Sequence, residues 1–294
     1  MRHKTADLDG PVHYLDFGGT GKPLLMVHGL GGSALNWMAV VPRWRRATTP
    51  WPSTSQASGR LHCSTGRLPS GPTPTSFTPS SVIGEPVSIM GNSMGGHIAV
   101  LEAADHPASV SALILVDPAI PGVHVRRPEP RRLGVMAGLT IPGLAEIILD
   151  RRVRALGPEG MVLETLAIVC ADASRVPRDV VEAHVQLMRE RDKLGPQNGR
   201  AFLEASRSIG LRMADPRFWS RVAKKVEAPT LVVHGSLDRL IPIAAARDLA
   251  RRRPDWTLEI LEGIGHVPMM EAPSTFMDAL NAWSPYRIAR EPAA

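Results

Sequence analysis

The chain reads Val87-Ser88-Ile89-Met90-Gly91-Asn92-Ser93-Met94-Gly95-Gly96-His97-Ile98-Ala99 at the point that decides its fold. Strand-forming residues run into a glycine-rich turn, and helix-forming residues follow it, so the stretch predicts a strand, a tight turn and a helix. Glycines on both sides of Ser93 remove Cβ atoms that would clash in so sharp a turn. The serine hydroxyl then stands above the sheet edge, beside a helix N-terminus that favours negative charge. The stretch predicts half of an acyl-transfer site.

Short apolar runs elsewhere predict further strands, and helical patterns lie between them. The expected strands cover residues 12–17, 24–27, 112–116, 230–233 and 258–261, and the expected helices cover 33–40, 244–252 and 274–283. Strands that alternate with helices favour a mostly parallel, doubly wound sheet with helices on both faces. The predicted fold class is therefore α/β.

The strand signal disappears between residue 120 and about residue 222. Helical patterns replace it, at 144–153, 161–170 and 179–191, with prolines and glycines between them. We therefore expect an α/β core made of residues 1–119 and 223–294, with a helical insertion at 120–222.

Three reactive side chains follow predicted strands: Ser93, Asp238 and His266. Open parallel sheets place their functional sites at the carboxyl ends of the strands. A serine hydroxyl needs an imidazole to take its proton, and the imidazole needs a carboxylate that fixes its tautomer and stabilises its cation. The order Ser, Asp, His, each at a strand end, predicts a catalytic triad. Asp117 also ends a predicted strand and stays open as an alternative orienting acid.

A glycine-rich loop follows the strand at 24–27 and reads His28-Gly29-Leu30-Gly31-Gly32. Backbone N–H groups in such a loop can point at an oxyanion, and Leu30 is the residue whose N–H we expect to do so. A plain strand-to-helix turn is the alternative. The nearby Gly21-Lys22 pair is not a phosphate loop, because proline follows the lysine and no glycine stands five residues before Gly21.

Four motifs together resemble the α/β-hydrolase superfamily, over residues 10–41 and 82–285. They are His28-Gly29-Leu30-Gly31-Gly32, Gly91-Asn92-Ser93-Met94-Gly95-Gly96, Asp238-Arg239-Leu240-Ile241-Pro242 and Gly265-His266-Val267-Pro268-Met269-Met270-Glu271-Ala272-Pro273. The resemblance implies Ser93 as nucleophile, His266 as general base and then acid, and Asp238 as its orienting acid.

The resemblance also implies an oxyanion hole made by the N–H groups of Leu30 and Met94. Residues expected to support the two loops are His28, Gly29, Gly31, Gly91 and Gly95. The helical insertion looks like the family's cap, which lines the substrate pocket. Because the nucleophile position is serine, the sequence argues against relatives that use aspartate there to open epoxides or displace halide. Ester, lipid-ester, thioester and carbon–carbon bond hydrolysis remain open, on a small-molecule substrate and with neither a metal nor an organic cofactor.

Composition narrows the remaining function classes. The chain has 294 residues, 44% of them hydrophobic, and a formal charge of +6. Five arginines and no acidic residue lie between residues 42 and 81, so the excess charge is local and argues against nucleic-acid binding.

No window offers the roughly 20 apolar residues that a membrane span needs, and the expected location is cytoplasmic. Cys63 and Cys170 form neither a disulfide framework nor a metal-ligand pattern. The oligomeric state is not readable from the sequence.

One segment departs from the family pattern. Residues 43–81 are rich in Ser, Thr, Pro and Gly where an interior strand and a helix are expected, and this composition predicts disorder. Synonymous codons for residues 51–59, read from their third base, encode Ala-Val-Asp-Leu-Pro-Gly-Phe-Gly, which restores a strand end and turn. We therefore hypothesise that the segment is read out of frame. Loss of an interior strand predicts weakened folding and an impaired or dead hydrolase as the alternative to an active one.

Overall fold

The structure is a computed structural model. It describes residues 2–7, 11–18, 21–41, 52–56, 85–119, 144–193, 197–213 and 221–283. Most of the segment at 43–81, with Cys63, lies outside these ranges, as does the start of the helical insertion at 120–143.

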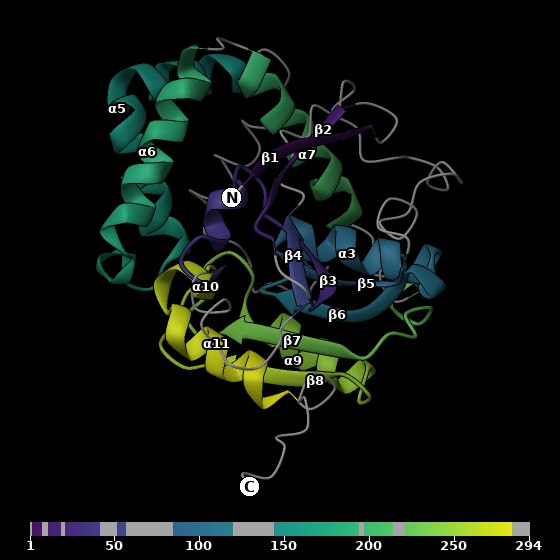
Figure 1. The fold of residues 1–294 in the computed structure, drawn as a ribbon. Coiled ribbons are helices and arrows are strands. Elements are labelled where there is room, and N and C mark those ends of the chain that lie inside the picture. The colour runs from purple at the N-terminus through teal and green to yellow at the C-terminus, as the bar shows by residue number, and fades with distance from the viewer. Residues whose placement is uncertain are drawn as a thin grey trace, which may run out of the picture.

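A single eight-stranded sheet organises the chain (Figure 1). Its strands are β1 (Arg2–Asp7), β2 (Pro11–Asp16), β3 (Gly21–Val27), β4 (Pro52–Gln56), β5 (Val87–Asn92), β6 (Val110–Val116), β7 (Thr230–Gly235) and β8 (Thr257–Leu261). Their order is β1-β2-β4-β3-β5-β6-β7-β8. The β1–β2 and β2–β4 pairs are antiparallel, and every pair from β4 to β8 is parallel. The predicted mostly parallel sheet is confirmed.

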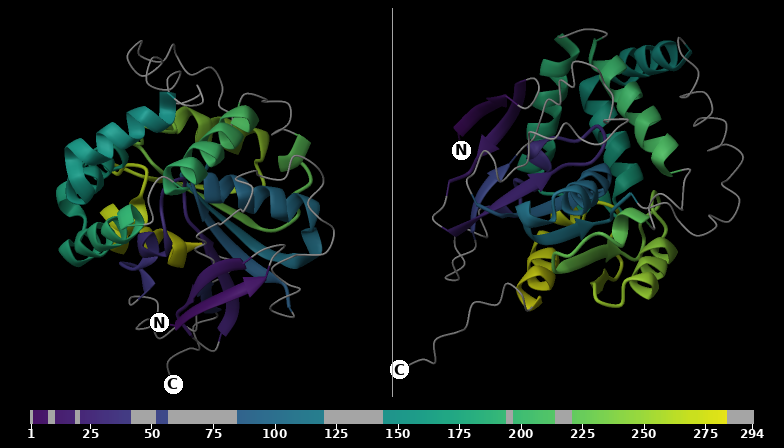
Figure 2. Two further views of the ribbon diagram at one scale, coloured as in Figure 1. Left: turned by 90° about the horizontal axis from the view of Figure 1, so that it is seen from above. Right: turned by 90° about the vertical axis from the view of Figure 1, so that its right-hand side faces the viewer.

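Apolar residues of the central strands face two separate cores. On β6, Ile114 and Val116 belong to one core, while Leu113 and Leu115 belong to the other. The first core contains residues of the 3₁₀ helix η1 (Ala34–Trp37), of α10 (Pro268–Glu271) and of α11 (Pro273–Ala282). The second contains residues of α3 (Met94–Asp105) and α9 (Ile243–Arg252). A strand buried on both faces explains why its sequence is an unbroken apolar run. The helices on both sides of the sheet are visible in Figure 2.

Three longer helices lie together outside the sheet layers (Figure 1). They are α5 (Leu144–Val169), α6 (Arg178–Lys193) and α7 (Gln197–Met213), and we call them the cap helices. α5 kinks at Gly157, whose φ of 62° and ψ of 175° are not helical, so the expected break between 153 and 161 is a bend and not a loop. Short 3₁₀ turns, η2 (Pro107–Ser109) and η3 (Ala173–Arg175), complete the described elements. The boundaries of the insertion, at 120 and 222, stay a prediction.

The prediction of a missing interior strand is wrong. Residues 52–56 form β4, which pairs parallel with β3 and antiparallel with β2, at the place where the family pattern expects a strand. Backbone hydrogen bonds do not depend on the side chain, and proline lacks only the N–H donor, so the polar sequence Pro-Ser-Thr-Ser-Gln can still fill this position in the ladder. The disorder predicted for the rest of 43–81 falls outside the described residues, and the reading frame stays a hypothesis.

Two smaller expectations also need correction. The helix expected at 33–40 is reduced to the short η1, which Ser33 and Asn36 close at its start with a reciprocal capping box. Strand β1 has no apolar alternation and was not predicted; it forms by pairing along β2. In the described part of the chain, no helix has the length and apolar character to cross a membrane.

Candidate active site

Ser93 lies in the turn between β5 and α3, in a strained backbone conformation. Its φ of 54° and ψ of −117° are outside the regions that residues with a side chain normally adopt. The two glycines of the motif are required by close approach. A Cβ on Gly91 would lie 2.3 Å from the Gly95 carbonyl oxygen, and a Cβ on Gly95 would lie 2.3 Å from the Val27 carbonyl oxygen. The turn therefore accepts only glycine at both positions.

Backbone hydrogen bonds fix this strained turn. The Ser93 N–H donates to the Val116 carbonyl at 2.9 Å, and the Ser93 carbonyl accepts from Ala119 N at 2.9 Å and His97 N at 3.2 Å. Although Ser93 occupies the N-cap position of α3, its side chain makes no capping hydrogen bond. The hydroxyl is thus not used to stabilise the helix.

Asp238 and His266 meet although they are 28 residues apart. His266 Nδ1 donates to Asp238 Oδ2 over 2.6 Å, and both side chains are buried. Asp238 Oδ1 accepts from the N–H groups of Leu240 at 2.7 Å and Ile241 at 3.0 Å. Burial acts to raise the pKa of Asp238, but the hydrogen bond from His266 and the charge of that ring outweigh it, so the pKa lies below its ordinary value. The carboxylate is therefore ionised and fixes the tautomer with hydrogen on Nδ1.

This pair is attached to the serine turn through the residue before the serine. Asn92 Nδ2 donates to the backbone carbonyls of His266 and Val116, each at 3.1 Å. The histidine loop and the turn are thus held side by side. Asp117, the alternative orienting acid, instead accepts from Gly235 N at 2.9 Å. Within the described residues, the carboxylate bonded to His266 is Asp238.

The loop at 28–32 touches the serine turn directly. A Cβ on Gly29 would lie 3.0 Å from Ser93 Cβ, so the loop and the serine are in van der Waals contact. His28 is buried, and its Nδ1 donates to the Gly29 carbonyl at 2.8 Å. Gly31 has a positive φ of 72° and turns the loop away. Leu30 follows Gly29 directly, and Met94 follows Ser93 directly at the first position of α3.

Glu271 joins the cap helices to the histidine loop, a role that sequence reasoning missed. Its buried carboxylate accepts the N–H groups of Gly265 at 2.8 Å, Asp172 at 3.0 Å and Ala171 at 3.1 Å. His266 N also donates to the Val169 carbonyl, at the end of α5, over 2.7 Å. The conformation of the loop that carries His266 therefore depends on the residues that follow α5.

Arg191 is a second contact that the sequence did not reveal. From α6, its guanidinium donates to the carbonyl oxygens of Gly31 at 3.1 Å and Gly32 at 2.9 Å. The Phe202 ring of α7 lies against Gly31, 3.2 Å from the point where a Cβ would stand. Cap helices thus contact both the glycine-rich loop and the histidine loop.

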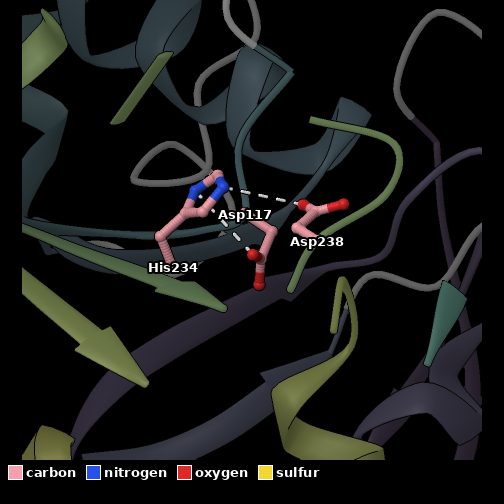
Figure 3. A group of neighbouring side chains, drawn as sticks. All are labelled: Asp117, His234 and Asp238. Atoms are coloured by element: carbon pink, nitrogen blue, oxygen red, sulfur yellow. Dashed lines mark ion pairs between the residues drawn. The ribbon is translucent and has the colours of Figure 1, made fainter. Parts of the chain in front are cut away.

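A buried cluster lies behind Asp238, and Figure 3 shows it. Asp117, His234 and Asp238 bring one ligand-type atom each within 4.8 Å of one another. His234 Nε2 donates to the Ile241 carbonyl at 2.9 Å, and Asp238 Oδ2 already accepts from His266. A metal ion bound by all three side chains would compete with the hydrogen bond that His266 makes to Asp238 Oδ2. The donor set therefore fits hydrogen bonding and not a metal centre.

Comparison with known proteins decides the family. The model of the serine aminopeptidase S33 family (Hydrolase_4) matches residues 77–273, which include the serine turn, Asp238 and His266. The chain belongs to this family of α/β-hydrolases. This confirms the resemblance inferred from the four sequence motifs, and it makes the chain a member of a family of hydrolases.

Relatives of this hydrolase family differ in the substrates that their names give. The chain is 25% identical over 284 residues to 2-hydroxy-6-oxononadienedioate/2-hydroxy-6-oxononatrienedioate hydrolase 2 of Pseudomonas putida, covering 94% of this chain and 92% of that one. It is 30% identical over 212 residues to human monoglyceride lipase, covering 70% of this chain and 60% of that one. Among solved structures, Cfl2 of Burkholderia cenocepacia superposes with a TM-score of 0.69 at 18% identity, covering 95% and 94% of the two chains, and shows the shared fold.

Proposed function

We propose that the chain is a serine hydrolase that cleaves an ester or related acyl bond through an acyl-enzyme at Ser93. One observation carries the proposal: the 2.6 Å hydrogen bond between His266 and Asp238, on a loop that Asn92 ties to the serine turn. With hydrogen held on Nδ1 by Asp238, the imidazole of His266 offers Nε2 as the base.

In this mechanism, His266 takes the proton of Ser93 as the hydroxyl attacks the acyl carbon, and then gives it to the leaving group. Asp238 holds the ring and stabilises its cation. The N–H groups of Leu30 and Met94 would bind the oxyanion, because one belongs to the loop in contact with Ser93 and the other begins α3. Water activated by His266 then releases the acyl group. None of these steps requires a metal ion or an organic cofactor.

The substrate in this proposal is a small molecule held between the sheet edge and the cap. We propose residues 1–119 and 223–294 as the hydrolase core and 120–222 as that cap. The contacts of Arg191 with the glycine-rich loop, and of Ala171 and Asp172 with Glu271 beside the histidine loop, support a cap that is seated directly over the reacting groups. Neither nucleic acid nor a membrane is part of this proposal.

A screen of p-nitrophenyl esters of increasing acyl length tests the activity. The expected result is turnover that S93A abolishes and that S274A, on the exposed surface of α11, leaves unchanged. Turnover that survives in S93A would contradict the proposal. The preferred chain length would identify the acyl group that the cap accepts.

A second candidate is hydrolysis of a carbon–carbon bond beside a ketone. The match to the Pseudomonas putida dioate hydrolase supports it, because it covers nearly the whole of both chains. The same serine, histidine and acid would be used, on a substrate that carries carboxylates. Faster turnover of a keto-dienedioate than of any neutral ester favours this candidate, and the reverse order favours the ester.

The third candidate, an impaired hydrolase, depended on the absence of an interior strand. Since β4 occupies that place, the structural reason to expect an impaired hydrolase is weaker. A gene with the frame restored across residues 43–81 should give a protein that unfolds at a higher denaturant concentration, because an apolar strand replaces a polar one. Equal midpoints for the two proteins would remove the stability argument for a frameshift, and sequencing of the DNA tests the frame itself.

A further inference from the structure

Asp117 is a buried acid that the proposed mechanism does not use. It directly follows β6, has a positive φ of 43°, and its side chain is fully buried. Oδ1 accepts the Gly235 N–H at 2.9 Å, while buried Oδ2 has no hydrogen-bond partner. In the part of the chain that the structure describes, neither lysine nor arginine pairs with it. A carboxylate with one neutral donor and no cation is costly to bury.

His234 limits where protons can be in this cluster. Its Nε2 donates to the Ile241 carbonyl at 2.9 Å, so that nitrogen carries hydrogen. Burial lowers the pKa of His234, so the ring is neutral and Nδ1 carries no hydrogen. Nδ1 lies 3.7 Å from Asp117 Oδ1 without a hydrogen-bond partner. If Asp117 were ionised, the unprotonated Nδ1 of His234 and the Asp117 carboxylate would face each other with no hydrogen between them.

Asp238 approaches the same cluster from the other side. Its Oδ2 lies 3.7 Å from His234 Nε2, and it brings an oxygen within 4.8 Å of Asp117 (Figure 3). Asp238 is ionised, as its bond with His266 requires. Two ionised carboxylates this close, in a buried site, would repel each other strongly.

We propose that Asp117 is held as a neutral carboxylic acid and acts as a positioning residue for Asp238. Its proton gives Asp117 a hydrogen to donate toward the carboxylate of Asp238, and it leaves Asp238 as the single negative charge beside His266. The inference rests on the proposed function for its catalytic meaning, but the protonation of Asp117 can be measured without activity.

The surrounding charges agree with this assignment. The titratable groups around Asp117 are His234 on β7, Asp238 in the loop after β7, His266 in the loop after β8, and Glu271 on α10. Burial, the charge of Asp238 and the charge of Glu271 raise the pKa of Asp117 well above its ordinary value, and the Gly235 N–H opposes them only in part. His234 is neutral and offers no compensating positive charge.

Infrared difference spectroscopy of the free protein at pH 7 tests the protonation. The wild type should show the carbonyl-stretch band of a protonated carboxylic acid, and D117N should lack it. D248N is the matched control, because Asp248 lies on α9 away from the cluster and is paired with Arg251 and Arg252. A spectrum in which D117N removes only carboxylate bands would overturn the proposal.

Activity measurements test the positioning role. Loss of the donor in D117A should lower kcat about tenfold, the size of one charge-assisted hydrogen bond. It should also move the acid limb of the pH profile of kcat/KM to higher pH. Without the hydrogen-bond donor of Asp117, the Asp238 carboxylate stabilises the protonated ring of His266 more strongly. D117N, which is neutral and can still donate, should restore both. A loss in D117A without movement of the limb, or D117N as impaired as D117A, would overturn the role; a fully inactive wild type with the infrared band present would count against the proposed function alone.

Discussion

Replacement of Asp238 by asparagine tests the role of this acid, because the structure fixes how the amide must lie. Oδ1 accepts the N–H groups of Leu240 and Ile241 at 2.7 and 3.0 Å. Only the amide oxygen can occupy that place in D238N. The amide NH₂ must then occupy the place of Oδ2, 2.6 Å from His266 Nδ1 in the native chain.

The enforced amide orientation reverses the tautomer of His266. A donor opposite Nδ1 requires Nδ1 to accept, so the ring proton moves to Nε2, and Nε2 can no longer take the proton of Ser93. Correct geometry with the wrong tautomer lowers kcat about 10⁴-fold, which is about 5.4 kcal/mol of transition-state stabilisation.

The assay is the steady-state hydrolysis of the best p-nitrophenyl ester by the wild type, D238N and the control D248N. Thermal unfolding of the three proteins shows whether D238N remains folded. We expect D238N to lose activity with little change in KM, and D248N to retain it. A folded D238N with more than about a tenth of the wild-type kcat would refute the assignment of Asp238 as the orienting acid.

Three further predictions concern stability. G95A should lower the free energy of unfolding by about 3 kcal/mol or more, since its Cβ would overlap a backbone carbonyl oxygen, whereas G210A, in open space on helix α7, should raise it by about 0.5–1 kcal/mol; urea denaturation measures both. E271Q should lower the free energy of unfolding by about 2–3 kcal/mol and lower kcat as well, because three backbone N–H donors lose a buried carboxylate. D278N, on an exposed site of α11, is the control. Equal unfolding midpoints for E271Q and the wild type would contradict the stabilising role of the Glu271 carboxylate. Burial lowers the pKa of His97 from 6.5 to about 4. Between these two pH values, His97 is therefore protonated in the unfolded chain and neutral in the native protein. The free energy of unfolding should therefore fall by up to about 3 kcal/mol as the pH falls from 6.5 to 4. H97Q should reduce this dependence of the free energy of unfolding on pH. Identical dependence in H97Q and the wild type would refute the role of His97.

Local patterns predicted the fold and the places of the reactive side chains. The glycines around Ser93 can be read from the sequence because their requirement is steric and local. The same holds for the apolar runs of the parallel strands, which are buried on both faces. Asp238 was recognisable because it follows such a run in β7, and His266 because it follows the edge strand β8, in which apolar residues alternate with exposed ones. The bend of α5 at Gly157 was also visible, as a glycine–proline pair.

Contacts between distant segments could not be predicted in this way. Glu271 looks like any acidic residue of a short helix, and its three donors come from two loops far apart in the chain. Strand β4 has neither alternation nor apolar residues, so only its backbone pairing with β2 and β3 reveals it. The proton that we assign to Asp117 depends on burial and on the tautomer of His234, and neither can be read from a sequence.

Labelling with a fluorophosphonate tests the central claim most directly, since only a serine activated by a neighbouring base reacts at a useful rate. Intact-mass analysis of the wild type should show one phosphonyl group, located on Ser93 by peptide mapping. Both S93A and D238N should remain unlabelled over the same time. A folded wild-type protein that stays unmodified, or that carries the label on another residue, would contradict the account.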